Sequence, residues 1–326
     1  MALIETRTPA EAAGHFRRPT RFMNGPVFDR LFKGLSVGSA LFVLLILTGF
    51  FIALAAGAWP ALVRFGPAFV WTTTWNPVTG EFGALPAILG TLITSAIAIV
   101  LAVPFAFAIA LFISQLAPSW LRQPLGVAVE LLAAIPSIIY GMWGLFVFAP
   151  AFAQYVEGPI VDLFEDVPVL STIFKGPAIG IGMATAGIVL AIMILPFIAA
   201  VMRDVMDTVP RRLKESGYAI GATDWEVARA IIIPHARSGL AGAIFLGLGR
   251  ALGETMAVTF IIGNANRITA AIFSPGNTIA SVIANEFQEA YTPLHSSALI
   301  ALGLLLFIIT FIVLAAARLM LKRIAS

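Results

Sequence analysis

Long apolar stretches alternate with short polar segments along most of the chain. Six of these stretches have about 20 residues or more, the length that a helix needs to cross the hydrocarbon core of a bilayer. Backbone groups in hydrocarbon must be paired within the segment, so each stretch is predicted to be α-helical. The expected helices span 35–58, 87–111, 125–148, 179–202, 240–262 and 298–318. The pattern therefore predicts an all-α, polytopic integral membrane protein with six transmembrane helices.

The composition agrees with this pattern. Hydrophobic residues make up 60% of the chain, charged residues only 11%, and the mean hydropathy is +0.97. A soluble protein carries roughly 25% charged residues, so much of this surface is expected to face lipid. Membrane helices tolerate proline by kinking, and four prolines lie in or at the ends of the expected helices: Pro86, Pro104, Pro136 and Pro196.

The uneven distribution of Lys and Arg predicts the orientation in the membrane. The N-terminal arm, the segments after the second and fourth helices and the C-terminal tail hold 16 of them, whereas the alternate segments hold three, Arg64, Lys175 and Arg267. Both termini are therefore expected in the cytoplasm, with residues 1–34 as a cytoplasmic arm and 35–326 as the membrane domain. The polar arm leads directly into a long helix, so we expect no cleavable secretory signal and interpret the first helix as a retained anchor.

Several classes of function are disfavoured by what the sequence lacks. There are no cysteines, which rules out disulfides and thiolate metal sites. The pI of about 9.5 reflects the predicted topology, and no basic groove with interleaved aromatic residues indicates nucleic-acid binding. An HExxH motif and a Walker A loop are also missing, so we expect no catalytic residues, metal or cofactor, and no ATP hydrolysis by this chain.

The polar segment 203–237 stands out between the fourth and fifth helices. It carries six Lys or Arg and five Asp or Glu in a chain that is otherwise poor in charge. Pro210 is expected to start one short helix and Gly221 to end it, while Thr223 or Asp224 caps a second helix that Pro234 stops at the membrane. The large amphipathic anchor Trp225 suits a surface that a soluble partner binds, although a simple connecting loop is the alternative. Small residues would let such a partner come close: Ser216, Gly217, Ala219, Gly221 and Ala222.

The spacing of this segment resembles the EAA loop of ATP-binding-cassette (ABC) importer permeases. In that pattern a Glu-Ala-Ala is followed by Gly at the seventh position and by Ile-x-Leu-Pro at positions seventeen to twenty. Ser216 and Gly217 replace the two alanines and Ile233 replaces the leucine, whereas the matching residues are Glu215, Gly221, Ile231 and Pro234. The resemblance implies that the segment sits in a cleft of an ATPase subunit and transmits its closure.

Three further runs resemble phosphate importer permeases of the PstC type. They are ELLAAIPSIIYGMWGLFVFAP from Glu130, AIMILPFIAAVMRDV up to Val205, and GLGRALGETMAVTFIIGN from Gly247. The resemblance covers the chain from about residue 31 onward. It implies a type I ABC importer permease fold in a prokaryotic cytoplasmic (inner) membrane. It also implies three partners in addition to membrane lipid: a similar second permease, an ATPase dimer and an extracytoplasmic phosphate-binding protein.

Two charges are predicted inside the fifth helix. Arg250 lies about 18 Å along the helix from its cytoplasmic end, where a charge costs at least about 2.5–3.5 kcal/mol. Glu254 follows four residues later, so on a continuous helix the two side chains share a face and can pair. The pair is interpreted either as a structural ion pair or as a site on the path of an anion, with Thr255 as a further hydroxyl donor. The close spacing of Gly249 and Gly253 also predicts a close helix contact.

Other acidic residues have open interpretations. Glu130, about six residues into the third expected helix, is either a carboxylate near the inner surface or part of the pathway, in gating or in pairing with a second permease. The segment 153–176 carries four acids and is either a solvated loop or a contact for an external delivery protein. Trp59, Trp71 and Trp75 are interpreted as an interfacial aromatic belt, and residues 278–289 as a short amphipathic helix.

The sequence therefore indicates an importer permease that forms half of a translocation pathway and couples to a separate ATPase. Phosphate is the favoured substrate because of the resemblance, with sulfate, molybdate or phosphonate as alternatives. An ion-coupled secondary transporter is the rival of another class, although no mirrored motifs relate the two halves of the chain.

Overall fold

The computed structural model describes the backbone of residues 26–325 and the side chains of residues 28–319. Most of the expected cytoplasmic arm 1–34 therefore lies outside the described residues. The first helix, α1 (Pro26–Phe65), begins nine residues earlier than expected, with a proline in its first turn and Asp29 close behind. Both residues suit a helix N-terminus, because proline has no N–H to leave unpaired and a carboxylate complements the dipole.

The described chain divides into two compact units. The first ends at Ala53 and contains most of α1, and the second runs from Leu54 onward. The second unit begins with the end of α1, a short helix and a small antiparallel hairpin, in which Trp75 pairs with Phe82. These first elements are α2 (Ala68–Trp71), β1 (Trp75–Asn76) and β2 (Glu81–Phe82).

The remaining elements of the second unit are helical. Its first half contains α3 (Leu85–Leu111), η1 (Phe112–Leu116), α4 (Ser119–Ala133), α5 (Ser137–Trp143), η2 (Gly144–Phe148), α6 (Ala149–Phe152), η3 (Ala153–Glu157), α7 (Gly158–Phe164) and α8 (Pro168–Ile173). Its second half contains α9 (Met183–Asp207), α10 (Arg211–Ala219), α11 (Asp224–Val227), η4 (Ala228–Ile232), α12 (Ile233–Leu252), α13 (Met256–Ile261), α14 (Ile279–Glu286), η5 (Phe287–Glu289) and α15 (Pro293–Ala325). The segments η1 to η4 are π-helical and η5 is a 3₁₀ turn.

Six helical stretches of the described chain are long and apolar enough to cross a membrane, which confirms the predicted number. They are Phe28–Phe65, Leu85–Leu116, Ser137–Phe164, Met183–Asp207, Asp224–Leu252 and Pro293–Leu319. The predicted amphipathic helix near residues 278–289 is also present, as α14 with Thr278 as its N-cap and η5 behind it.

The third expected helix, 125–148, is wrong in its bounds. The structure breaks it between α4 and α5, around Pro136. Proline has no N–H to donate, and the residue before it is disfavoured in the α region. Tyr140 compensates by donating its hydroxyl to the carbonyl of Leu132 across the break, at 2.9 Å. The spanning stretch therefore starts at Ser137 and leaves α4 as a separate helix.

The fifth expected helix, 240–262, is also wrong in its bounds. It starts earlier and ends at Leu252, where Gly253 is the C-cap, and α13 begins only at Met256. The expectation that Pro234 stops the preceding helix fails as well. The wider π-helical turn η4 pairs the N–H of Ile233 with the carbonyl of Ala228, so the chain passes Pro234 in the first turn of α12.

The core of the second unit is the contact between α3 and α9. A stripe of alanines at four-residue intervals along α3 is completely buried: Ala98, Ala102, Ala106 and Ala110. Side chains this small let two backbones approach closely. On the facing helix, Gly187 packs against Ile97, and further along Gly247 of α12 packs against Ile198. The close-contact glycines of α12 thus include Gly247 and also Gly239, which packs against Val205, whereas a Cβ at Gly249 would make only ordinary contacts.

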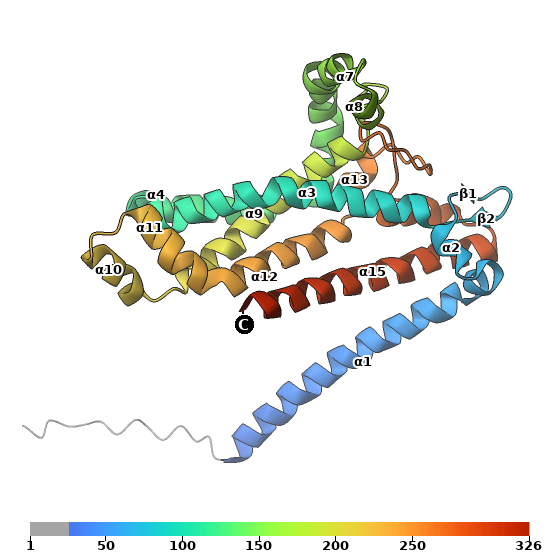
Figure 1. Cartoon of the computed structure of the whole chain (residues 1–326). Helices are drawn as coiled ribbons and strands as arrows, with labels where there is room; N and C mark the ends of the chain where they lie inside the picture. The colour runs from blue at the N-terminus through green and yellow to red at the C-terminus, as the bar shows by residue number, and fades with distance from the viewer. Residues whose placement is uncertain (1–25, 326) are drawn as a thin grey trace, which may run out of the picture. The chain divides into compact units, whose positions relative to one another are not determined.

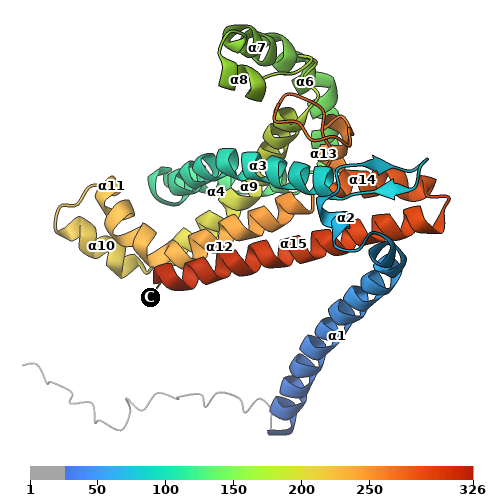
Figure 2. The same cartoon turned by 45° about the vertical axis from the view of Figure 1, so that its right-hand side comes forward.

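The ends of this bundle differ in character. In both views α10 and α11 lie at one end of α3, α9 and α12, together with the end of α15, and the β1–β2 hairpin lies at the other end (Figures 1 and 2). The helices α7 and α8 lie together beyond α13, away from α10 and α11. The bundle therefore separates the charged segment around α10 from the connecting segments of the opposite end.

Gly90 gives a test of this packing. A Cβ at Gly90 would overlap with the backbone carbonyl of Asn277, whereas a Cβ at Gly242 of α12 meets nothing within 4 Å. We expect Gly90→Ala to lower the free energy of unfolding by about 1–3 kcal/mol. Gly242→Ala should be neutral or stabilising, since alanine favours a helix over glycine by about 1 kcal/mol. Thermal unfolding of the purified variants in detergent measures both, and equal stability of the two would contradict the close approach of α3 to the Asn277 loop.

Candidate transport site and coupling surface

The polar segment 203–237 folds nearly as its sequence predicts. The helix α10 runs from Arg211 to Ala219, and Gly221 ends it in the left-handed region, at φ +86°. Thr223 then forms a capping box with Glu226, in which each side chain accepts the backbone N–H of the other residue. The two short helices are further joined by the Tyr218 hydroxyl, which donates to Asp224 at 2.9 Å.

One side of this helix pair is packed and the other is exposed. Val227 and Ile232 are buried in the core that includes α9. Gly217 is buried as well, because Ile231 and Val227 lie against it. The sequence interpretation, in which Gly217 leaves room for a partner, is therefore wrong: this glycine leaves room for the chain's own helix.

The exposed side of the pair carries large apolar residues. Ile220 is 87% exposed and Trp225 is 58% exposed, and Tyr218 lies partly open beside them. Other exposed residues of the polar segment 203–237, which the sequence predicts to contact an ATPase, are Glu215, Ser216, Gly221, Asp224 and Pro234. Isolated apolar residues are common on surfaces, but Ile220 at the C-cap of α10 and Trp225 in the first turn of α11 together suit the centre of an interface. We refer to Tyr218, Ile220, Gly221 and Trp225 as the coupling surface.

Two ionisable groups of this region are perturbed by burial. Burial lowers the pKa of the Lys214 ammonium, although the nearby Asp207 carboxylate opposes this effect, and Lys214 also donates to the carbonyl of Met206 at 3.4 Å. Burial raises the pKa of the Tyr218 hydroxyl, and its bond to Asp224 adds to the shift. Lys214 thus ties α10 to the end of α9.

The fourth membrane-spanning helix, α9, extends beyond the start of the polar segment and ends at Asp207. Arg203 still belongs to α9, and it bridges two acids, Glu130 of α4 at 2.7 Å and Asp204 at 2.7 Å. Gly126 of α4 leaves space for its guanidinium. The Glu130 side chain is 56% exposed, so this pair contributes little stability by itself. The partner that the structure gives to Glu130 is Arg203 of the same chain.

Arg250 lies in the last turn of α12, inside a membrane-spanning stretch. Its guanidinium lies over the ring of Phe197 of α9, 5.4 Å from the ring centre, and its charge acts on Tyr140 of α5. No ion pair joins Arg250 to an acid among the described side chains. Three helices thus meet at a half-buried cation that packs against an aromatic ring and has no carboxylate partner within residues 28–319.

The predicted pairing of Arg250 with Glu254 is therefore wrong. It assumed a continuous helix, but α12 ends at Leu252 and Glu254 lies in the break before α13. Its carboxylate instead accepts the N–H of Ala257 in the first turn of α13, at 3.1 Å. Thr255 lies in the same break, and its carbonyl accepts the hydroxyl of Thr259 at 2.7 Å. Both candidate residues stay half-buried beside the end of the Arg250 helix.

Sequence analysis missed two residues of this site, Tyr140 and Phe197. Nothing in their local pattern distinguishes them from other aromatic residues of membrane helices. Their role follows from the packing of α5 and α9 around the end of α12. The position of Tyr140 three residues after a helix break is the one signal that could have drawn attention to it.

The chain matches a known family of transport proteins. The family described as binding-protein-dependent transport system inner membrane component matches residues 102–326, which is more than half of the chain. The chain belongs to this permease family. It is accordingly a multi-pass inner membrane protein and a transport component rather than an enzyme.

Relatives of this permease match it over nearly its whole length. The phosphate transport system permease protein PstC of Mesorhizobium japonicum is 52% identical over 99% of this chain and 98% of its own length. The PstC protein of Pasteurella multocida is 52% identical over 94% of this chain and 95% of its own. A solved bacterial ABC transporter involved in the import of the acidic polysaccharide alginate has the same fold, with a TM-score of 0.57 and 17% identity, over 91% of this chain and 100% of that chain.

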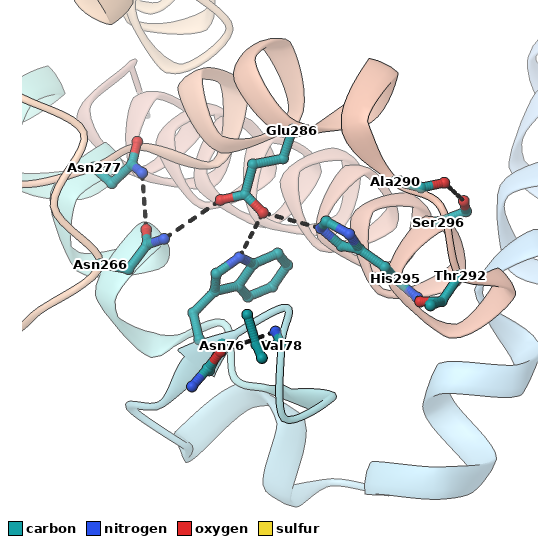
Figure 3. A network of polar contacts seen from close by, with 10 residues as sticks. Asn76, Val78, Asn266, Asn277, Glu286, Ala290, Thr292, His295 and Ser296 are labelled. Atoms are coloured by element: carbon teal, nitrogen blue, oxygen red, sulfur yellow. Dashed lines mark hydrogen bonds and ion pairs between the residues drawn. The ribbon is translucent and has the colours of Figure 1, made fainter.

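At the hairpin end of the permease, a polar network joins elements that are distant in sequence (Figure 3). The carboxylate of Glu286 accepts the indole N–H of Trp75 at 2.8 Å and lies 3.0 Å from Nε2 of His295. Asn266 joins Glu286 at 3.5 Å and Asn277 at 2.8 Å (Figure 3). Trp75 is thus part of a network that ties the hairpin to α14 and α15, and only Trp59 and Trp71 of the predicted belt are mainly exposed.

The acidic segment 153–176 is not uniformly solvated. Glu157 is buried, and its carboxylate accepts the N–H of Gly180 at 2.7 Å, which fastens η3 to the approach of α9. The other three acids of this segment follow in or just after α7. One of the four acids is therefore structural.

The capping box gives a test of how the coupling surface is held. We expect Thr223→Ala to destabilise α11 locally by about 1 kcal/mol, because it leaves the N–H of Glu226 unpaired. Amide hydrogen exchange of residues 224–232 should then be several-fold faster. Ser216→Ala is the control, since Ser216 donates only to a carbonyl within α10 and its loss leaves no N–H unpaired. Unchanged exchange in Thr223→Ala would show that packing alone holds α11.

Proposed function

We propose that this permease is the membrane subunit of an ATP-driven phosphate importer and that it forms half of the translocation pathway. The observation that carries the proposal is Arg250, a cation in a membrane-spanning stretch without an acidic partner in the described part of the chain. A charge in such a place costs several kcal/mol unless water, a partner or a substrate meets it. An anionic substrate that passes this point would meet it during each cycle.

Phosphate is the substrate that both the chemistry and the relatives support. The two PstC relatives are named as phosphate transport permeases. At neutral pH phosphate carries one to two negative charges, and the planar guanidinium offers two parallel N–H donors to its oxygens. The ring of Phe197 holds the guanidinium without competing for those donors.

Glu254 and Thr255 have a different role from the one that a continuous helix implied. Glu254 caps α13 and therefore adds a negative charge near the cation without bonding to it. We propose that this charge keeps phosphate binding weak enough for release. Thr255 lies in the same irregular turn, and non-helical backbone at membrane depth is tolerated where it borders protein or a water-filled path. The break after Leu252 therefore marks the proposed path. Glu130 is placed by its bond to Arg203 in a different polar site, and we propose no contact with phosphate for it.

The coupling surface supports the second half of the proposal, which is docking to a separate ATPase. Its exposed Ile220 is the C-cap of α10 and its exposed Trp225 belongs to α11. These two helices lie at the end of the bundle away from the hairpin (Figure 1) and are fixed by a cap and by buried contacts. A rigid surface of this kind transmits movement, because α11 continues through η4 directly into α12, which carries Arg250. A movement of the coupling surface can thus be passed along one helix to the proposed path.

The partners follow from this arrangement. We propose that a second, similar permease completes the pathway, that an ATPase dimer binds the two coupling surfaces, and that an extracytoplasmic binding protein delivers phosphate to the hairpin end. The excess of Lys and Arg around α10 and in the C-terminal tail supports a cytoplasmic location for that end. Alternating access would then expose Arg250 first to the binding protein and, after ATP hydrolysis, to the cytoplasm.

Neutralising Arg250 tests the pathway. We expect Arg250→Gln to reduce ATP-driven uptake of labelled phosphate into reconstituted vesicles about a hundredfold, because two charge-assisted hydrogen bonds together contribute about 3 kcal/mol. Arg250→Lys keeps the charge but loses the two parallel N–H donors of the guanidinium, and it should retain intermediate uptake. Copurification of the ATPase should be unchanged in both variants. Wild-type uptake by assembled Arg250→Gln complex would rule out this residue as part of the path, and competition by sulfate but not phosphate would reassign the substrate.

Placing a charge on the coupling surface tests docking. We expect Ile220→Asp to weaken ATPase binding by at least about 2 kcal/mol, the size of an interface hot spot, and so to reduce the ATPase that copurifies with this permease. Val78→Asp is the matched control, because Val78 is 95% exposed in the hairpin at the other end of the bundle. Equal amounts of ATPase with both variants would show that the ATPase does not bind at Ile220.

A further inference from the structure

A basic hollow lies in the connecting segments near α8 and α13, away from the coupling surface. Its cavity volume is about 440 Å³. Its walls come from the segment between α8 and α9 and from the loop between α13 and α14. The lining residues are Lys175, Gly176, Pro177, Arg267, Thr269, Ala271 and Ser274. We call this hollow the outer pocket.

The outer pocket has a fixed frame. The N–H of Ile272 donates to the carbonyl of Ile173 at 2.8 Å, and its own carbonyl accepts the N–H of Ala184 at 2.9 Å. The carbonyl of Ser274 accepts the N–H of Met183 at 3.3 Å. Gly176 lies so close to Phe273 that a Cβ would overlap with it. Backbone hydrogen bonds thus fix the loop between α13 and α14 to the end of α8 and the start of α9.

The charge of the outer pocket is entirely positive. Lys175 and Arg267 come from segments far apart in the sequence, and no acidic residue lines the hollow with them. Within residues 28–319 neither side chain forms an ion pair. Bringing two like charges to one hollow costs free energy, and a bound anion would remove that cost.

The polar lining of the outer pocket offers donors. The oxygen of Thr269 accepts the N–H of Ala271 at 3.1 Å, which leaves its hydroxyl hydrogen for another acceptor. The Ser274 hydroxyl has no hydrogen-bond partner among the described residues. An ammonium, a guanidinium and two hydroxyls together match a ligand that has several acceptor oxygens and a negative charge.

We infer that the outer pocket is an oxyanion-binding subsite that takes inorganic phosphate before it reaches Arg250. The inference rests on the proposed function for the direction of transport. The pocket is larger than one phosphate ion, so the ion stays partly hydrated and binds weakly, as a site that must pass it on requires. The N–H of Gly276, in the pocket loop, donates to the carbonyl of Ile262 at 3.0 Å, just after α13. One short stretch of chain therefore joins the subsite to the break after Arg250.

The absence of native cysteine from this chain allows a direct test. In the assembled importer, Thr269→Cys introduces a thiol into the outer pocket, and Val78→Cys introduces one at an exposed position that does not line it. We expect millimolar inorganic phosphate to slow modification of Cys at 269 by an anionic thiol reagent at least threefold and to leave the rate at 78 unchanged. Ser274→Cys is the second reporter if the first variant does not assemble. The label on this chain is read by its mass, so thiols of other subunits do not interfere.

Charge-neutral variants complete the test. Lys175→Gln or Arg267→Gln, added to the reporter, should abolish protection by phosphate, whereas Arg64→Gln should preserve it. Arg64 is the matched control because it is the third basic residue expected on the same side of the membrane and does not line the pocket. Protection by sodium chloride at equal ionic strength would show charge screening alone and would overturn the inference.

Two other results would also overturn it. One is no protection by phosphate up to 50 mM, about the weakest binding that could matter for transport. The other is protection by the phosphate-free binding protein together with none by phosphate, which would make the hollow a docking site for a protein. The labelling needs no transport, so it separates this inference from the proposed function: loss of ATP-driven uptake in the wild type would refute the latter and leave the labelling result intact.

Discussion

Lipid tails are as apolar as the side chains they would replace, so no hydrophobic force draws membrane helices together and close packing must hold them. In this permease the packing is that of α3 on α9, where a buried stripe of alanines faces a helix that includes Gly187. Several other elements of the second unit pack on this pair. The helix α12 packs against both members, and α4 and α13 pack against α9. The positions of Arg250 and of the coupling surface follow from that contact.

Two interruptions in otherwise apolar stretches give the site its character. Pro136 separates α4 from α5 and brings Tyr140 near Arg250, and Gly253 ends α12 immediately after Arg250. A helix end in a membrane leaves carbonyl groups unpaired, and a cation in the last turn of a helix is stabilised by them. The same interruption frees Glu254 to cap α13. An uninterrupted helix would have joined the two charges and neutralised the cation that the proposed function requires.

The polar groups of the permease are distributed by role. Around α10 and α11 they fix a small helical surface and leave its apolar residues exposed. In the network around Glu286 the polar groups hydrogen-bond to one another, and these bonds join the hairpin to α14 and α15. At Arg250 and in the outer pocket, cations face open space or aromatic rings instead of carboxylates. Cations without a carboxylate partner among residues 28–319, at Arg250 and in the outer pocket, suit the proposed route for an anion.

The sequence by itself determined the class of the molecule. Six apolar stretches dictate six spanning helices, because hydrocarbon forbids unpaired backbone groups. Local chemistry also fixed α10, the Gly221 turn and the Thr223 cap, since each depends on residues within a few positions of it. Tertiary structure decided what depends on neighbours far along the chain. It paired Arg203 with Glu130, packed Phe197 against Arg250 and bonded Trp75 to Glu286. It also buried Gly217 against Ile231. The failed pairing of Arg250 with Glu254 has the same origin. A spacing of four residues predicts a shared face only while the helix continues, and whether it continues past Gly253 depends on how α13 packs against α5 and α9.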